Sequence, residues 1–473
     1  MKHRSPKRYG DTARHLLDKT AHKMTHHGYS VALRVVVGLI FLIVVGSSLL
    51  MLPGMAVERP LTPTEAIFTA TSALTVTGLS IITPGSDLTL MGKIVLLALI
   101  QIGGVGFMFI AVILLQILGR RILLYDRLAL SDSLGLDSPR AVLTLVKRTL
   151  IGVLVIEAIG AMLLWVNWMR ILPPETAFGY AIFHAISAFC NAGFDLFHGA
   201  QDINGVPFNG IPRDNFSLAI MGALILLGGL GIPVISEVLS IHDRKRYSLN
   251  TRITLVVVAG LTMTGWIGLF LSEAYTGSVL ADEPLSSQLM QTLFQSISNR
   301  TAGFAGLPQF HRLSAAGGLL IIVMMFVGCA PASMGGGITT GTFSVLMISL
   351  VGYVRGYDSP RLFNRTVDAD TRQRAGAILT IALVLLVVST WLILITNPTL
   401  GFELVLFEVV SAFATCGLSL GITSDLNGFG KIIIMILMFW GRLGPLTVVI
   451  ALAQNRRKAK NLVQYPEEQI LIG

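Results

Sequence analysis

Long apolar stretches, separated by shorter polar segments, recur along the whole chain. The apolar stretches lie at residues 31–52, 94–118, 255–271, 317–327, 378–395 and 432–452. Most of them are long enough for a membrane-spanning helix, which needs about 20 apolar residues. The run at 317–327 is shorter and stops at a glycine-rich break. The pattern therefore predicts a polytopic membrane protein built from helices.

Four short segments of similar sequence lie between these stretches. They read SALTVTGL at 72–79, SAFCNAGF at 187–194, ISNRTAGF at 297–304 and SAFATCGL at 411–418. Their glycines, Gly78, Gly193, Gly303 and Gly417, are 115, 110 and 114 residues apart. In three copies a serine stands six residues before the glycine and a phenylalanine ten before. In the third copy Ile297 holds the serine position and Phe294 is one residue closer, and this regular spacing indicates four internal repeats.

Each motif ends a short, partly apolar segment that opens near a proline or an acidic residue. A helix of about 12 residues cannot cross a bilayer, so we expect it to be re-entrant, with its irregular end facing a water-filled cavity. Two full spans flank each motif, so all four repeats face the same way. We therefore expect an all-α polytopic membrane protein: four helix–pore-loop–helix repeats with eight transmembrane helices, in a pseudo-fourfold arrangement around one central pore. A packed helical bundle without a pore is the alternative.

Basic residues set the expected orientation. Of the 35 Lys and Arg, 27 fall in five segments, at 1–34, 120–148, 244–252, 355–374 and 456–460. This alternation follows the positive-inside rule and predicts a multi-pass protein of the cell (plasma) inner membrane with both termini and three loops in the cytoplasm. The expected parts are a cytosolic tail at 1–30, repeats at 31–120, 141–241, 250–352 and 373–454, and a cytosolic tail at 455–473.

Composition agrees with a membrane protein and argues against a nucleic-acid partner. The chain is 53% apolar and only 13% charged, with mean hydropathy +0.73. A soluble domain carries about 25% charged residues. The formal net charge of +9 is spread over the membrane-orienting segments rather than gathered in one nucleic-acid-binding arm.

The four motifs can offer backbone carbonyl oxygens to a cation in place of its water shell. Glycine permits backbone conformations closed to other residues. No carboxylate occupies the motifs, which argues against a filter of charged side chains. Stacked carbonyl rings suit a monovalent cation whose hydration shell is labile. The candidate filter residues are Thr75, Val76, Thr77, Gly78, Cys190, Asn191, Ala192, Gly193, Arg300, Thr301, Ala302, Gly303, Ala414, Thr415, Cys416 and Gly417.

A glycine interruption recurs in the second span of each repeat. It reads GGVG at 103–106, GGLG at 228–231, GGG at 335–337 and GRLG at 441–444. Close helix packing is an ordinary explanation for the first two. The third is followed by ITTG at 338–341 and cannot be a helix interior, so we expect an unwound segment that faces a cavity. A phosphate-binding loop is disfavoured because the lysine-serine or lysine-threonine ending of such loops is missing.

Arg442 is the one basic residue deep inside a predicted span. An intramembrane charge is a candidate functional residue, with an ion pair to Glu157 or Glu237 as the structural alternative.

The sequence resembles the Trk/Ktr/HKT superfamily of cation transporters. The most specific matches are NRTAGF at 299–304 and APASMGGGITTG at 330–341, and the resemblance covers about residues 31–454. The first span begins near residue 31 and directly precedes the first motif. This arrangement is more similar to the eight-span KtrB membrane subunits of bacterial Ktr systems than to Trk subunits with two extra spans.

The resemblance implies potassium uptake by a channel-like subunit, and Gly78 at the first filter position implies preference for potassium over sodium. It implies an intramembrane gate made of Ser333, Gly335, Gly336, Gly337, Thr339, Thr340, Gly341 and Arg442. The implied partners are a second copy in a homodimer, a cytosolic KtrA-type nucleotide-binding ring that regulates the gate, and membrane lipid. Na⁺ is implied as an activator, although no sodium site is identifiable, and no cofactor is expected.

Other function classes are less well supported by the residues. A Trk-type subunit or a parallel-repeat secondary carrier stays open, and turnover rates would distinguish a carrier from a channel. An enzyme is disfavoured because the spans contain no HExxH, GxSxG or paired catalytic carboxylates. We expect Cys190, Cys329 and Cys416 to be packing residues without a disulfide framework, and His184 and His242 to be packing or surface residues.

Overall fold

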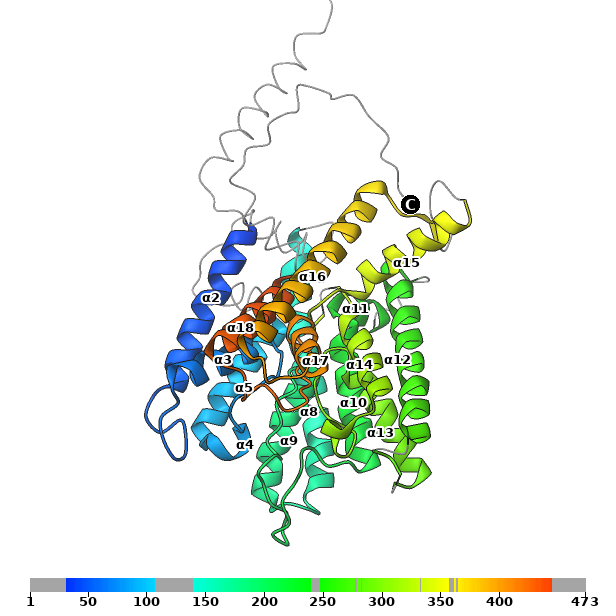
Figure 1. Ribbon diagram of the computed structural model, residues 1–473. Helices are drawn as coiled ribbons and strands as arrows, with labels where there is room; N and C mark the ends of the chain where they lie inside the picture. Colours follow the sequence, from blue (N-terminus) through cyan, green and yellow to red (C-terminus); the bar gives the residue numbers. More distant parts are fainter. Residues whose placement is uncertain are drawn as a thin grey trace, which may run out of the picture.

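The computed structural model describes residues 31–106, 139–239, 247–276, 279–281, 283–331, 333–356, 361–362 and 365–444. The two predicted tails, the second half of the apolar stretch at 94–118, and His242 lie outside the described residues. Figure 1 shows the helices gathered in one bundle, with α2 (Val31–Leu50) at one edge and α12 (Leu249–Thr276) at the other. Within the described chain, the departure from an all-α structure is a small antiparallel hairpin of β1 (Arg361–Leu362) and β2 (Arg365–Thr366).

Each predicted repeat contains a short helix between longer ones. The first repeat holds α2, α3 (Pro63–Leu74), α4 (Pro84–Asp87) and α5 (Leu90–Val105). The second holds α8 (Pro139–Trp168), α9 (Pro174–Phe189), α10 (Asn215–Leu230) and α11 (Ile232–Leu239). The third holds α12, α13 (Leu285–Ser298), the turn η1 (Phe310–Arg312), α14 (Ala315–Phe326) and α15 (Thr340–Val354), and the fourth holds α16 (Ala369–Thr396), α17 (Phe402–Phe413) and α18 (Gly428–Leu443).

Several of these helices have the length and composition of membrane spans. Among the described residues, three are long and apolar enough to cross a membrane: Leu150–Trp168, Leu249–Thr276 and Ala369–Thr396. Five shorter apolar helices accompany them, at Val36–Leu50, Leu90–Val105, Asn215–Leu230, Ala315–Phe326 and Thr340–Val354. The prediction of a mostly helical chain of membrane-protein type is therefore confirmed.

The short helices pack in a closed circle. The second long helix of each predicted repeat contacts the short helix of the next: α5 contacts α9, α10 contacts α13, α14 contacts α17, and α18 contacts α3. The repeated phenylalanines strengthen these contacts. Phe68 packs in the core formed with α16 to α18, Phe183 in the core of α2 to α5, and Phe294 in the core of α8 to α10. Each of these rings thus inserts into the preceding repeat in the circle.

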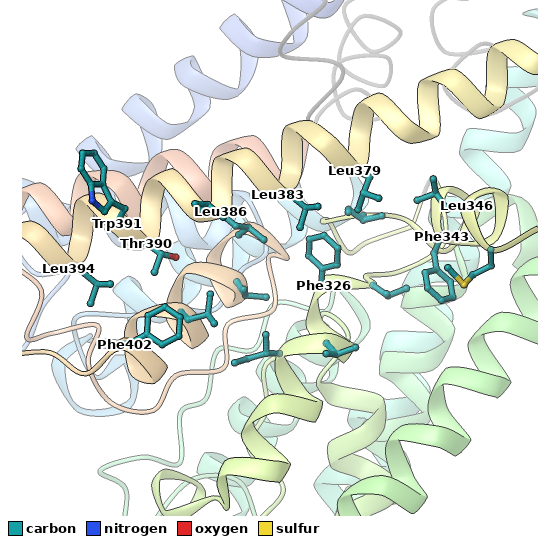
Figure 2. A pocket seen from close by; sticks show the side chains of 18 residues that line it. Phe326, Phe343, Leu346, Leu379, Leu383, Leu386, Thr390, Trp391, Leu394 and Phe402 are labelled. Carbon is teal, nitrogen blue, oxygen red and sulfur yellow. The ribbon is translucent and has the colours of Figure 1, made fainter. Parts of the chain in front are cut away.

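An apolar cavity of about 680 Å³ lies between α14, α15, α16 and α17 (Figure 2). Apart from Thr390, its lining residues are aliphatic, aromatic or methionine. The wall includes Val327 and Ile338, which bracket the interruption between α14 and α15, and the rim includes the exposed Val387 and Trp391. The cavity therefore connects the outer surface of the bundle with the back of this interruption.

Candidate functional site

Capping residues in the sequence mark the ends of the four short helices. α3 and α9 start at prolines, whose fixed φ suits a first helical turn. α3 also has a capping box, in which Thr62 accepts from the backbone of Glu65 and Glu65 accepts from the backbone of Thr62. All four helices end at the start of the motif. Their C-cap residues are Thr75, Cys190, Asn299 and Ala414.

The four motif glycines form a closed ring. All have left-handed backbone, with φ of +93° at Gly78, +68° at Gly193, +74° at Gly303 and +90° at Gly417. A Cβ added to any of them would lie 3.1–3.2 Å from the Cα of the next glycine, in the order 78, 193, 303, 417 and back to 78. It would approach the preceding carbonyl oxygen of that neighbour still more closely: Ala192, Ala302, Cys416 and Thr77 in turn. Glycines that are more than 100 residues apart in the sequence thus meet in one ring because no side chain separates them.

A serine in each repeat holds the turn around its glycine. Ser72 and Ser411 accept from the backbone N–H of Gly78 (3.0 Å) and Gly417 (3.1 Å). Ser187 and Ser298 instead donate to the carbonyl oxygen of the residue after the glycine, Phe194 (3.0 Å) and Phe304 (2.7 Å).

In the third repeat Ser298, and not Ile297, is therefore the equivalent serine, which corrects the sequence assignment. Counted from the equivalent phenylalanine and serine to the glycine, the third repeat is one residue shorter than the others, so Phe294 and Ser298 stand nine and five residues before Gly303. The other three repeats place a non-glycine residue in left-handed backbone two positions before the glycine: Val76, Asn191 and Thr415. Among residues 299–302 no residue has positive φ, because the third repeat lacks this extra residue.

Most predicted filter residues are buried around the ring, while the four glycines keep some accessible surface. Thr75 and Thr77 hydrogen-bond each other through their hydroxyls (2.8 Å) behind the first strand. Arg300 differs from the rest, because its buried guanidinium donates to the carbonyl of Gly328 (3.0 Å), after α14. Its contribution to the ring region is therefore its backbone.

The glycine interruptions of the second spans serve both close packing and helix termination. Gly103, Gly228 and Gly441 lie against the carbonyls that end the short helices, at Leu74, Phe189 and Phe413, where an added Cβ would collide. Three residues later α5, α10 and α18 end at a glycine of positive φ: Gly106, Gly231 and Gly444. The packing explanation and the break explanation both hold for the first two interruptions.

The third interruption is an irregular segment between α14 and α15. Residues 327 and 338 pair as a short parallel bridge, Gly328 N donates to Ile338 O (2.9 Å), and Thr340 N donates to Cys329 O (3.0 Å). Thr339 is the N-cap of α15, so Thr340 and Gly341 belong to the helix and not to the unwound segment predicted to include them.

This interrupted segment lies directly against the ring of motifs. Gly336 N donates to Thr415 Oγ1 (2.9 Å), and a Cβ on Gly335 would meet the side chain of Thr301 at 2.5–2.7 Å. The segment also reaches two other broken spans, through Met334 N to Gly228 O and Gly337 N to Gly441 O, both 3.3 Å. Ser333 has a buried hydroxyl without a hydrogen-bond partner among the described residues.

Arg442 connects residues of three of the four predicted repeats. From the last turn of α18 its guanidinium donates to the carbonyls of Met334 in the interrupted segment, of Gly103, and of Gly104 (3.3 Å). Gly103 and Gly104 are in the last turn of α5, where carbonyls lack intrahelical donors and the helix dipole favours a cation. Glu157 accepts instead from Gln101 (3.1 Å).

Glu237, the other ion-pair candidate, accepts from the backbone and hydroxyl of Ser248 (2.6 and 2.7 Å). The contacts of Arg442 with backbone carbonyls thus match a contact with the interrupted segment rather than an ion pair with Glu157.

The three cysteines are free and buried, as expected. Sequence reasoning missed the recurring polar residue that follows each repeated phenylalanine, although it expected His184 to be a packing or surface residue. These residues are Thr69, His184, Gln295 and Glu408, all fully buried. Their signal was a polar residue in the same place on four helices, directly after the repeated phenylalanine.

Fold, composition and the ring of glycine turns define a helical membrane protein of the cation-transport class. The chain belongs to the TrkH family of cation transport proteins, whose family model matches residues 17–462. The members of this family are transporters rather than enzymes.

Individual relatives support this membership. The chain is 37% identical to the Ktr system potassium uptake protein B of Vibrio alginolyticus, over 90% of this chain and 91% of that protein. It is 34% identical to the potassium/sodium uptake protein NtpJ of Enterococcus hirae, over 92% and 96%. The crystal structure of the potassium transporter TrkH from Vibrio parahaemolyticus has a similar fold, with a TM-score of 0.69, 18% identity, and coverage of 92% of this chain and 87% of that one.

Proposed function

We propose that this chain takes up potassium across the plasma membrane through one central pore. The observation that carries the proposal is the closed ring of Gly78, Gly193, Gly303 and Gly417. Four backbone strands that meet without side chains can direct carbonyl oxygens to a common axis and replace the hydration shell of a monovalent cation. The potassium uptake protein of Vibrio alginolyticus at 37% identity supports potassium as the substrate.

The architecture that we infer is four helix–pore-loop–helix repeats with eight transmembrane helices and both termini in the cytoplasm. The circle of contacts from α5 to α9, α10 to α13, α14 to α17 and α18 to α3 supports a pseudo-fourfold axis. The short helices α3, α9, α13 and α17 then act as pore helices whose C-terminal ends point at the ion path. Partial negative charge at those ends favours a cation.

The interrupted segment between α14 and α15 and Arg442 form the resting gate in this proposal. The segment lies against Thr301 and Thr415 of the filter and spans from Gly228 to Gly441. Arg442 places a fixed positive charge beside it and ties it to α5. A cation that follows the axis inward therefore meets both a backbone obstruction and a repelling charge.

The partners that we infer are a second copy of the chain, a cytosolic KtrA-type nucleotide-binding ring and membrane lipid, with Na⁺ as an activator. The names of the Ktr-system relatives support a multi-component system. Lipid chains are the expected occupants of the apolar cavity in Figure 2, because its rim residues Val387 and Trp391 are on the outer surface of the bundle.

The test is cation uptake by the purified chain in liposomes, measured as rubidium and potassium flux with sodium varied. The proposal is supported if the flux is selective for potassium and if its maximal rate per protein is far above the turnover rate of a carrier. Equal transport of sodium would indicate a potassium/sodium uptake protein, and strict coupling with slow turnover would indicate a carrier. No flux from well-folded protein, with or without a cytosolic partner, would contradict the proposal.

A further inference from the structure

Four buried polar residues occupy equivalent places on the short helices, each directly after the repeated phenylalanine. Thr69 follows Phe68 on α3, and the same position is His184 on α9, Gln295 on α13 and Glu408 on α17. All four are fully buried or nearly so. A buried polar side chain costs free energy unless it is hydrogen-bonded, and a membrane interior offers little water to help. Their partners therefore indicate what they do.

Glu408 binds the chain that leaves the glycine ring in the fourth repeat. Its carboxylate accepts from the hydroxyl of Ser419 (2.9 Å) and from the hydroxyl of Thr423, and these two hydroxyl oxygens are 3.0 Å apart. Ser419 comes two residues after Gly417 and also accepts from the backbone N–H of Gly421 (3.0 Å). A single side chain on α17 thus fixes the first six residues beyond the ring.

Gln295 makes the same kind of connection in the third repeat. Its side-chain oxygen accepts from the backbone N–H of Gly306 (2.7 Å), three residues after Gly303. Its side-chain nitrogen donates to the side-chain oxygen of Asn299 (2.6 Å) at the end of α13. One amide therefore links the helix end and the outgoing strand.

His184 makes the equivalent connection in the second repeat. Its Nε2 is 3.0 Å from a carboxylate oxygen of Asp195 and 3.3 Å from the backbone nitrogen of Leu196, two and three residues after Gly193. The same Asp195 oxygen accepts from the backbone N–H of Phe197 (2.7 Å).

The first repeat lacks such a connection. The hydroxyl of Thr69 has no hydrogen-bond partner among the described residues. The outgoing strand of this repeat is held locally, where Ser80 donates to the carbonyl of Ile82 (2.7 Å). In three quadrants, a side chain of the short helix thus contacts the strand that leaves the glycine ring, and we call this contact a brace. The fourth quadrant, that of Thr69, has no brace.

We propose that Glu408, Gln295 and His184 are positioning residues that hold the outer strands of the glycine ring and thereby set ion selectivity. The proposal rests on the function proposed above. A carbonyl filter distinguishes ions by the number and placement of its oxygens. A brace that ends two to six residues from the glycine restrains that placement without touching the ion. The three braces differ chemically, so each quadrant is held by its own contacts.

Glu408 gives the sharpest test, because a matched residue lies on the same helix. Glu403 is an exposed carboxylate in the first turn of α17. Potassium and sodium fluxes of Glu408→Ala, Glu408→Gln and Glu403→Gln are compared in liposomes, normalised to incorporated protein. We expect the potassium-to-sodium flux ratio to fall on the order of tenfold in Glu408→Ala, which removes the acceptors of two hydrogen bonds. The fall is smaller in Glu408→Gln, which keeps one acceptor, and absent in Glu403→Gln.

A second arm removes the donors and leaves the carboxylate in place. Ser419→Ala combined with Thr423→Val should lower the flux ratio as Glu408→Ala does. Combining all three changes should add little, since one interaction is being removed from both sides. Thr69→Val is the matched change in the unbraced quadrant and leaves the ratio unchanged, because an unpaired hydroxyl is replaced by an isosteric methyl.

The outcomes separate the two proposals. If the wild-type chain shows no selective potassium flux, the function proposed above fails. If the wild type is selective and the loop variant Ser419→Ala with Thr423→Val keeps the wild-type ratio, the positioning role is overturned. The same conclusion follows if Glu408→Ala folds and keeps the ratio. A loss of total flux at unchanged ratio would mark a merely structural role and would also overturn it.

Discussion

At the scale of single residues, the ring combines two constraints that only glycine satisfies. The left-handed backbone costs other residues about 1–2 kcal/mol. Close approach adds a steric term, because each glycine faces a backbone carbonyl of its neighbour. Next to the ring, Val76 and Thr415 are β-branched residues at φ of 49°, a conformation that ordinarily occurs only under constraint. Strain of this kind gathers at functional sites.

Gly78→Ser should reduce the preference for potassium over sodium by at least about tenfold while the protein still folds. A tenfold change corresponds to a loss of about 1.4 kcal/mol in the free energy that separates the two ions. A serine Cβ collides with the Ala192 carbonyl and displaces oxygens in two quadrants. Gly54→Ser is the matched control, because Gly54 has φ of +86° and nothing within 4 Å of an added Cβ. Flux ratios in liposomes check both variants, and wild-type selectivity in well-expressed Gly78→Ser would refute the filter assignment.

At the scale of elements, local signals predicted much of the fold. The prolines at 63 and 174 are the observed first residues of α3 and α9, since the fixed φ of proline acts locally. The alignment of the third repeat was wrong at the serine. Counting back from the glycine without a gap places Ile297 opposite the serines of the other repeats, and the one-residue deletion becomes visible only in the structure. The braces were missed as well, because a partner such as Thr423 is 15 residues from Glu408 and only the folded loop brings it back.

The start of α3 carries a pH-dependent stability term. Glu65 accepts from Nη1 (2.9 Å) and Nη2 (2.7 Å) of Arg59, which lowers the pKa of Glu65 from 4.5 to about 2. A carboxyl whose pKa is lowered on folding stabilises the fold above its unfolded pKa, and the contribution is lost as the pH falls through the folded pKa. The window is therefore from about pH 4.5 down to about pH 2.

We expect the melting temperature of the wild type to exceed that of Glu65→Gln at neutral pH, and the difference to shrink as the pH falls through this window. Thermal melts of the detergent-solubilised protein over a pH series measure it. Glu58→Gln is the control, since Glu58 is an exposed neighbour. A difference that stays constant down to pH 2 would argue that Glu65 acts through packing and not through its charge.

The interrupted segment and Arg442 give a second element-scale prediction. Arg442→Ala removes three donations to backbone carbonyls and the charge beside the segment. Basal potassium flux should rise several-fold, because the lost hydrogen bonds stabilise the closed segment by about 1 kcal/mol or more. The flux ratio of potassium to sodium should be nearly unchanged. Arg442→Lys keeps the charge but cannot reach all three carbonyls, so its basal flux should lie between that of the wild type and that of Arg442→Ala. Unchanged or abolished flux in folded Arg442→Ala would favour a purely structural role.

At the scale of the whole molecule, the circle of contacts makes the four short helices and the predicted repeats around them mutually dependent. Each short helix is packed by its own repeat and by the preceding one, as for α3 with α2 and α18. A change in one quadrant therefore disturbs its neighbours. The interrupted segment between α14 and α15 contacts α5 through Arg442 and also contacts Thr301 and Thr415 of the glycine ring, so it connects several of them. Such a molecule suits regulation by an external partner that moves one element.

The chain alone should show flux that does not respond to nucleotides, with a response restored by a cytosolic partner from the native host. The proposed reason is that regulation resides in a separate nucleotide-binding ring on the basic cytoplasmic face. Copurification from that host followed by liposome flux with and without nucleotide measures it. A full nucleotide response from the isolated chain would contradict the proposed division of labour.

The ring also has a direction. Every added Cβ points to the next repeat in one rotational sense, from the first repeat to the second, third and fourth and back to the first. Second-site suppressors of a glycine substitution should therefore lie in the next repeat of this rotational order. Growth-restoring second-site changes for a Gly78 variant are expected around Ala192 in the second repeat, and those for a Gly417 variant around Thr77 in the first. Suppressors scattered evenly over both neighbours of an altered repeat would show that the collision spreads through the whole ring before it is relieved.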